Sequence, residues 1–288
     1  MQQMLPMQAV FSSLLSLFLR FTTPQPSLVT TFHVPRRLRC CLYYPPSYTT
    51  TSKRPYPVYI NLHGGGFDAG TPESDGEFCA FLAERADCIV CSPEYRLAPE
   101  YPYPAALQDC LAALDWVEQT LQPPRIALEG FSVGGTFALS VAQLQTSKLS
   151  SVVAVFPSPM DLSENSVHDF TNKDPMKRNM YHEAYLLSTS RDSLTDPLLS
   201  PAYAVRSELP PSVLFIAARF DPNIQDLLKF MEKMKAEKGF IGKVYEDVFH
   251  GWVNVPDSLG FFLGAERKEK KWDAFRLIAQ EIKKGFYV

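Results

Sequence analysis

Residues 125–144 read Arg-Ile-Ala-Leu-Glu-Gly-Phe-Ser-Val-Gly-Gly-Thr-Phe-Ala-Leu-Ser-Val-Ala-Gln-Leu. The apolar run that opens this stretch predicts a buried strand, and residues 136–144 predict a helix. Gly130 and Gly134 flank Ser132 at the junction, which gives the pattern G-x-S-x-G. A serine raised clear of a sheet needs a sharp, strained turn, and side chains at the two flanking positions would collide with neighbouring elements. The stretch therefore predicts an exposed serine between a strand and a helix.

Val133 follows this serine in the first turn of the predicted helix. A backbone amide there is free to donate to an anion, and the helix dipole favours negative charge at that end. The pattern is short, however, and an ordinary glycine-rich turn also matches it. Partners elsewhere in the chain decide between the two interpretations.

The composition is that of a globular protein with a sizeable core. The chain has 288 residues, of which 46% are hydrophobic and 20% charged, enough for one large α/β domain or two small ones. A net charge of −3 gives no electrostatic case for binding nucleic acid or an anionic membrane. The charge balance therefore argues against these two classes of partner.

The six cysteines predict buried free thiols rather than disulfides. Cys88 and Cys91 bracket a strand-like Ile-Val pair, and Cys110 lies in a predicted helix. The Cys-x-x-Cys spacing lacks a second pair or nearby histidines, so a zinc site is not expected. We expect a cytoplasmic protein with no metal and no organic cofactor.

The N-terminal residues 1–25 are predicted to form a cap helix or a tail. The apolar run at 9–19 lacks a basic flank, is followed by a poor cleavage site, and is too short to span a bilayer. A helix lying over the domain is the preferred interpretation, and a membrane-surface anchor is the alternative; secretion also stays open. Its apolar face would carry Leu14, Leu17, Phe18 and Phe21.

Beyond residue 26, predicted strands and helices alternate to the end of the chain. This rhythm is typical of an α/β domain with a mostly parallel sheet and helices on both faces. The first two strands are expected to form an antiparallel pair at the sheet edge. The predicted strands are 27–34, 37–44, 58–63, 88–92, 125–128, 151–156, 213–218 and 243–248, and the predicted helices are 77–85, 104–117, 136–144, 224–238 and a last one around 272–282.

A glycine-rich loop follows the predicted strand that ends at His63. Consecutive glycines let backbone amides approach a substrate oxygen, because no Cβ stands in the way. Together with the amide of Val133, those of Gly64 and Gly65 would form an oxyanion hole. Alone, the loop would be a flexible turn; with a G-x-S-x-G motif downstream, an oxyanion hole is favoured.

An acid and a histidine follow the last two predicted strands. Asp221 comes at the C-terminal end of a strand, where open α/β sheets bind ligands, although it could also cap the next helix. Asp226 is the alternative acid, but it falls inside that helix. Of the five histidines, only His250 follows both the serine and the acid and lies at a strand end. The order Ser132, Asp221, His250 is that of an α/β-hydrolase.

On these residues the chain resembles the hormone-sensitive-lipase-like branch of the α/β-hydrolases. The branch is marked by H-G-G-G ahead of G-D-S-A-G-G and by Y-R-L-A-P-E-x-x-F-P-A-A. Its motifs are matched at residues 63–66, 130–135 and 95–106, and shorter matches occur at 209–211, 221–222 and 249–251. The resemblance covers roughly residues 55–285. It implies an α/β-hydrolase fold over 26–288, with a small helical cap inserted at about 161–206.

The resemblance also implies a serine hydrolase that cleaves carboxylic esters through an acyl-enzyme. Ser132 would be the nucleophile, His250 the general base and Asp221 the residue that orients it. Hydrolysis of a thioester, lactone or amide, or acyl transfer, uses the same triad and stays open. A ligand receptor of the same fold is the remaining alternative. A monomer and a homodimer are both compatible with the sequence.

Two positions depart from the family motif. Phe131 replaces the aspartate that precedes the nucleophile, and Val133 replaces an alanine. Phe131 removes a charge and adds bulk, so we expect altered substrate shape or activity. Glu94 and Arg96, in the Y-R-L-A-P-E region, are expected to form a structural ion pair.

Overall fold

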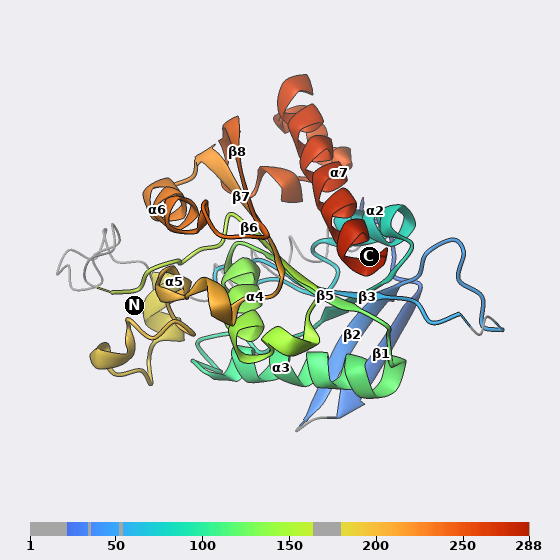
Figure 1. Cartoon of the computed structure of the whole chain (residues 1–288), viewed down its shortest axis with the longest axis horizontal. Coiled ribbons are helices and arrows are strands. Elements are labelled where there is room, and N and C mark those ends of the chain that lie inside the picture. The colour runs from blue at the N-terminus through green and yellow to red at the C-terminus, as the bar shows by residue number, and fades with distance from the viewer. Residues whose placement is uncertain (1–21, 34–35, 52–53, 164–179, 288) are drawn as a thin grey trace.

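A computed structural model describes residues 22–33, 36–51, 54–163 and 180–287. Within these residues the fold is one eight-stranded sheet with helices on both faces (Figure 1). The strands are β1 (Leu28–His33), β2 (Arg37–Tyr43), β3 (Val58–Leu62), β4 (Ile89–Pro93), β5 (Ile126–Phe131), β6 (Ser151–Val155), β7 (Ser212–Phe220) and β8 (Phe240–Phe249). The α-helices are α2 (Gly76–Ala86), α3 (Ala105–Trp116), α4 (Val133–Leu144), α5 (Met180–Tyr185), α6 (Ile224–Met234) and α7 (Ala265–Tyr287).

The sheet is mostly parallel, as predicted. Its strand order is β1-β2-β4-β3-β5-β6-β7-β8, and only the β1–β2 and β2–β4 pairings are antiparallel. Helices α2 and α7 pack together on one face, and α3 and α4 cover the other (Figure 1). The central strands β3, β5 and β6 are buried along their whole length. Strands covered on both faces need the continuous apolar runs that the sequence has there.

The strand order reverses between β3 and β5. From β3 the chain moves outward to β4, whereas from β5 it moves the other way to β6. The loops that leave the C-terminal ends of β3 and β5 therefore diverge, and a crevice opens where such sheets bind ligands. The H-G-G-G loop and Ser132 follow these two strands, so the topology brings them to the same place.

Two predicted boundaries are wrong at the far edge of the sheet. Helix α6 ends at Met234, before the expected 238, and β8 begins at Phe240, before the expected 243. The reason is a tight turn at Gly239, which has a φ of 78° and packs its Cα against the carbonyl of Pro211. Only glycine fits such a turn easily. The chain therefore leaves the helix early and enters an exposed edge strand.

Most of the predicted N-terminal cap helix or tail (1–25) lies outside the described residues, at 1–21, and so does 164–179 of the predicted insertion. None of the described helices is both long and apolar enough to cross a bilayer. All six cysteines are buried and unbridged, as predicted.

The core contains an unusual acid, Glu129, on the central strand β5. The side chain is fully buried, and within the described residues neither carboxyl oxygen has a hydrogen-bond partner. Burial raises the pKa of Glu129 well above its usual value, with a smaller contribution from Asp75. Glu129 is therefore carried as the neutral acid, because an unpaired buried carboxylate would cost far more.

Replacing this acid by its neutral isostere should change how stability depends on pH. Because the pKa is raised on folding, wild type has its full stability below the unfolded value of about 4.5 and loses stability as pH rises. The slope is at most about 1.4 kcal/mol per pH unit. Glu129→Gln does not titrate at this position. The free energy of unfolding of the variant minus that of wild type, measured in urea, should therefore increase between pH 5 and pH 8. Parallel stability profiles would contradict the buried neutral acid.

Candidate active site

The backbone at Ser132 has the strained geometry that the motif predicts. Its φ is 53° and its ψ is −122°, outside the regions that a serine prefers. A Cβ on Gly130 would lie 2.0 Å from the carbonyl carbon of Gly134, and a Cβ on Gly134 would lie 1.9 Å from the carbonyl oxygen of Leu62. Both flanking glycines are therefore required, since the turn is packed against itself and against the end of β3.

The structure brings Ser132, His250 and Asp221 together at the C-terminal edge of the sheet. The Oγ of Ser132 lies 2.8 Å from Nε2 of His250, and Nδ1 of the same ring lies 2.6 Å from Oδ2 of Asp221. Asp221 is buried, whereas the His250 side chain is 30% exposed. With its Nδ1 proton donated to Asp221, the neutral imidazole can accept the serine proton at Nε2.

Local hydrogen bonds hold the acid in this position. Asp221 follows β7, and its Oδ1 accepts the backbone amide of Asn223 at 2.8 Å, which leaves Oδ2 for the histidine. The alternative acid, Asp226, lies in α6 and pairs with Lys229 at 3.0 Å. It does not take part in the Ser132–His250 arrangement.

Aromatic rings support the histidine from the core side. The ring of His250 packs against Phe156 at 4.8 Å between centroids, and Phe156 also contacts Trp252 at 5.5 Å. Phe131 packs against Phe156 at 6.1 Å and edge-on against Phe78 of α2 at 5.0 Å. Phe131 is therefore a core residue behind the histidine, and its bulk occupies the α2 face of the sheet.

The glycine loop passes directly over the serine. A Cβ on Gly64 would lie 3.5 Å from the Cβ of Ser132, so the two backbones are in contact there. Gly65 and Gly66 have φ values of 136° and 66°, which suit glycine. Val133 is the first residue of α4, and an amide in that position has no acceptor within the helix. The amides predicted for an oxyanion hole thus belong to segments that meet at Ser132.

A buried histidine and tyrosine brace this loop. Tyr95 donates its hydroxyl to the carbonyl of His63 at 2.5 Å, and the two rings stack at 4.1 Å. Nδ1 of His63 lies 2.8 Å from the carbonyl of Gly64. Burial lowers the pKa of His63 to about 4, so its ring is neutral at physiological pH. The sequence motif contained Tyr95, but only the fold reveals its hydroxyl as a support of the loop.

The far side of the loop is held by the segment predicted as an insertion. Phe67 has a φ of 78°, which is unusual for a bulky residue. Its ring stacks on Tyr185 of α5 at 3.8 Å and meets Phe137 of α4 edge-on at 5.7 Å. This aromatic packing stabilises the strained backbone that follows the three glycines.

The predicted ion pair between Glu94 and Arg96 is wrong. Arg96 instead pairs with Asp109 at 2.8 Å, and Glu94 pairs with Arg39 at 3.2 Å. The Asp109 carboxylate is fully buried on α3 and needs a guanidinium to compensate its charge. Both residues therefore form structural ion pairs, Glu94 with a residue of β2 and Arg96 with a residue of α3.

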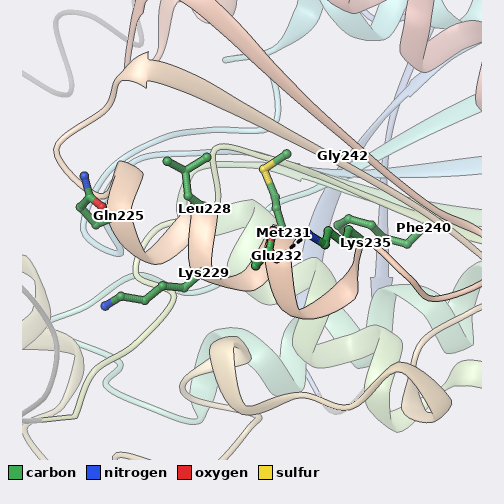
Figure 2. Close-up of a pocket in the computed structure, with 8 residues that line it drawn as sticks. All are labelled: Gln225, Leu228, Lys229, Met231, Glu232, Lys235, Phe240 and Gly242. Carbon is green, nitrogen blue, oxygen red and sulfur yellow. Dashed lines mark ion pairs between the residues drawn. The ribbon is translucent and has the colours of Figure 1, made fainter.

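The described residues also form an open groove at the edge of the sheet. Its volume is about 700 Å³, and it runs between α6 and the start of β8 (Figure 2). It is lined by Leu228, Met231 and Phe240 among others, with an ion pair between Lys235 and Glu232 at its side (Figure 2). None of Ser132, Asp221 and His250 lines it. Among the described residues, no group of three or more histidine, cysteine or acidic side chains is placed to hold a metal ion.

Comparison with known proteins identifies the family of this chain. Residues 59–254 match the model of the alpha/beta hydrolase fold family. The chain belongs to this family. Its relatives include the carboxylesterase NlhH of Mycobacterium tuberculosis, 31% identical over 74% of this chain and 70% of that protein. Esterase LipI of the same organism is 43% identical, over 35% of this chain and 33% of its own length. The predicted hormone-sensitive-lipase-like branch is confirmed.

Solved structures confirm the predicted α/β-hydrolase fold. A thermophilic carboxylesterase cloned from a metagenomic library superposes with a TM-score of 0.79, covering 99% of this chain and 98% of its own, at 24% identity. The hyperthermophilic esterase of the archaeon Pyrobaculum calidifontis gives the same TM-score and identity, over 99% of this chain and 94% of that one. At such low identity the likeness shows the fold alone.

A single methyl group added at Gly134 should be enough to destabilise the turn that carries Ser132. Gly134→Ala would place a methyl 1.9 Å from the carbonyl of Leu62, so β3 and α4 must move apart. We expect a loss of about 3 kcal/mol in the free energy of unfolding, measured in urea. Gly285→Ala on α7 is the matched control, because its nearest neighbour would be 3.7 Å away. That variant should gain about 0.5–1 kcal/mol. Equal stability of the two variants would contradict the packing described.

Proposed function

We propose that this protein is a serine hydrolase that cleaves carboxylic esters of small molecules. The observation that carries the proposal is the continuous series of contacts from Ser132 Oγ through the His250 ring to Asp221, at 2.8 Å and 2.6 Å. The membership in a family with carboxylesterase relatives supports the ester as the substrate bond.

In the first half of the reaction, His250 takes the proton of Ser132 as the hydroxyl attacks the ester carbonyl. Asp221 keeps the imidazole in the tautomer that can accept this proton, and it stabilises the imidazolium that forms. The tetrahedral oxygen would be stabilised by the amides of Gly64, Gly65 and Val133. Removal of one such donor typically costs about 10²–10³ in rate. His250 then protonates the departing alcohol, which leaves the acyl group on Ser132.

In the second half, a water molecule attacks the acyl-enzyme with His250 as its base. The same oxyanion donors act again, and collapse of the second tetrahedral intermediate releases the acid and restores the serine. The reaction needs no redox step, because the carbonyl carbon keeps its oxidation state throughout.

The described part of the predicted insertion fits a cap beside the acyl site. Its helix α5 contacts the oxyanion loop through Tyr185 and Phe67, so changes there would reach the site of charge development. The six buried thiols fit a reducing compartment, and we place the enzyme in the cytoplasm.

Covalent labelling separates an activated serine from a binding protein. Wild type should gain the mass of one phosphonyl group when it is incubated with a fluorophosphonate, and Ser132→Ala should gain none. Hydrolysis of p-nitrophenyl esters should fall on the order of 10⁴-fold or more in Ser132→Ala and in His250→Gln. Folded wild type that neither labels nor turns over an ester would favour the receptor alternative.

A substrate panel addresses the bond that is cleaved. Acyl esters of increasing chain length, a thioester, a lactone and an anilide of the same acyl group are compared by kcat/KM. The proposal requires the ester to be the best of the set. A large preference for thioester, lactone or anilide, or for transfer to an added alcohol over hydrolysis, would assign the triad to a different acyl reaction.

A further inference from the structure

We infer that Asp75 is a positioning residue that fixes two segments of the site relative to each other. One is β3, which leads into the glycine loop, and the other is the histidine loop, residues 250–257 after β8. This inference rests on the proposed function, because it concerns how the two halves of that site are kept in place. Asp75 is not part of any motif in the sequence, and it does not contact Ser132, His250 or Asp221 by any described hydrogen bond.

One buried carboxylate makes both connections. Asn254 donates its side-chain amide to Oδ1 of Asp75 at 2.7 Å, and Asn61 donates its amide to Oδ2 at 3.3 Å. Asp75 is 5% exposed and Asn61 is fully buried, so water has little access to the carboxylate and both hydrogen bonds are strengthened. Hydrogen bonds to a charged group in such a place are among the strong ones.

The two amides come from the two halves of the site. Asn61 lies on β3, two residues before His63 and the glycine loop. Asn254 lies in the short turn after β8, four residues after His250. Asn254 and Asp75 are separated by 179 positions in the chain. Asp75 itself immediately precedes α2, so the start of this helix connects the oxyanion side to the histidine side.

The carboxylate is suited to this arrangement in its ionised form. An ionised carboxylate only accepts hydrogen bonds, and two amide donors point at its two oxygens. Burial raises the pKa of Asp75 to about 6, and the hydrogen bonds from Asn61 and Asn254 oppose this rise. At neutral pH the group is therefore charged and can accept from both amides.

Neighbouring contacts fix the histidine loop to the helices but do not reach β3. The amide of Asp257 donates to Glu77 of α2 at 3.0 Å, and Lys271 of α7 donates to the carbonyl of Val255 at 2.8 Å. These contacts stabilise the loop as a unit. The hydrogen bonds of Asp75 also fix the position of the histidine loop relative to the glycine loop after β3. This matters because a shift of about 1 Å between reacting groups can cost on the order of 10²-fold in rate.

Reciprocal exchange of the two side chains tests the inference. In Asp75→Asn, one side-chain oxygen is replaced by an NH2 group that faces the amide of Asn61 or Asn254. Two donors then meet, and the hydrogen bond to that asparagine is lost. Asn254→Asp alone places two carboxylates 2.7 Å apart. In the double variant Asp75→Asn/Asn254→Asp, Asn at 75 donates to Asp at 254 and still accepts from Asn61. The number of hydrogen bonds and the net charge are then those of wild type.

We expect kcat for a p-nitrophenyl ester to fall about 10-fold or more in each single variant, with KM changed less than about 2-fold. The double variant should recover most of the loss. The rate of inactivation by a fluorophosphonate should follow the same order, since it depends on the same serine, histidine and oxyanion donors. Rates are normalised to the amount of serine that finally labels, so misfolded protein does not count.

Arg206→Met is the matched control for a purely structural effect. Arg206 donates to the carbonyls of Leu209, Pro211 and Lys238 at the opposite, N-terminal edge of the sheet. Its loss should lower the melting temperature while kcat per labelled serine stays at the wild-type value.

The outcomes separate this inference from the proposed function. Wild type without ester turnover or labelling would overturn the proposed function itself. Active wild type with kcat unchanged in both single variants, or with a double variant as slow as the singles, would overturn the positioning by Asp75 alone.

Discussion

The contact between Gly134 and the carbonyl of Leu62 is the constraint on which the rest of the site depends. At this point the first turn of α4 passes across the end of β3 at a distance that leaves no room for a Cβ. The same close approach sets Gly64 against the serine and forces Ser132 into its strained conformation. A glycine motif and a reversal of strand order thus produce one result: Ser132 and the predicted oxyanion donors share a single location.

The two faces of the sheet support that location by different means. On the face of α3 and α4, aromatic packing among Phe67, Phe137 and Tyr185 holds the loop after the glycines. On the face of α2 and α7, aromatic packing around Phe78 and Phe131 is joined by a buried polar group, with Asp75 between Asn61 and Asn254. Dispersion contacts tolerate small displacements, whereas hydrogen bonds to a buried charge depend steeply on geometry. The hydrogen bonds of Asp75 are therefore better suited than the aromatic contacts to fix the positions of β3 and the segment after β8 relative to each other.

Much of this arrangement could be predicted from sequence, because the decisive residues lie in short local patterns. Ser132, Asp221 and His250 each follow a strand, and their chain order indicated the fold. The exceptions depended on distant partners. Arg96 was expected to pair with Glu94 but pairs with Asp109, and α6 ends early because Gly239 packs against Pro211. Asp75 could not be recognised, because nothing local distinguishes it from any other acid before a helix.

The stacking of Tyr185 on Phe67 bears on how such enzymes can be altered. Helix α5 contacts the loop that carries the predicted oxyanion donors, Gly64 and Gly65, through this stacking. A segment grafted here from another member of the family would therefore have to supply a flat ring at this contact. If the loop stabilises the oxyanion as proposed, a graft without that ring would change turnover of every substrate, and selectivity could not be redesigned independently of rate.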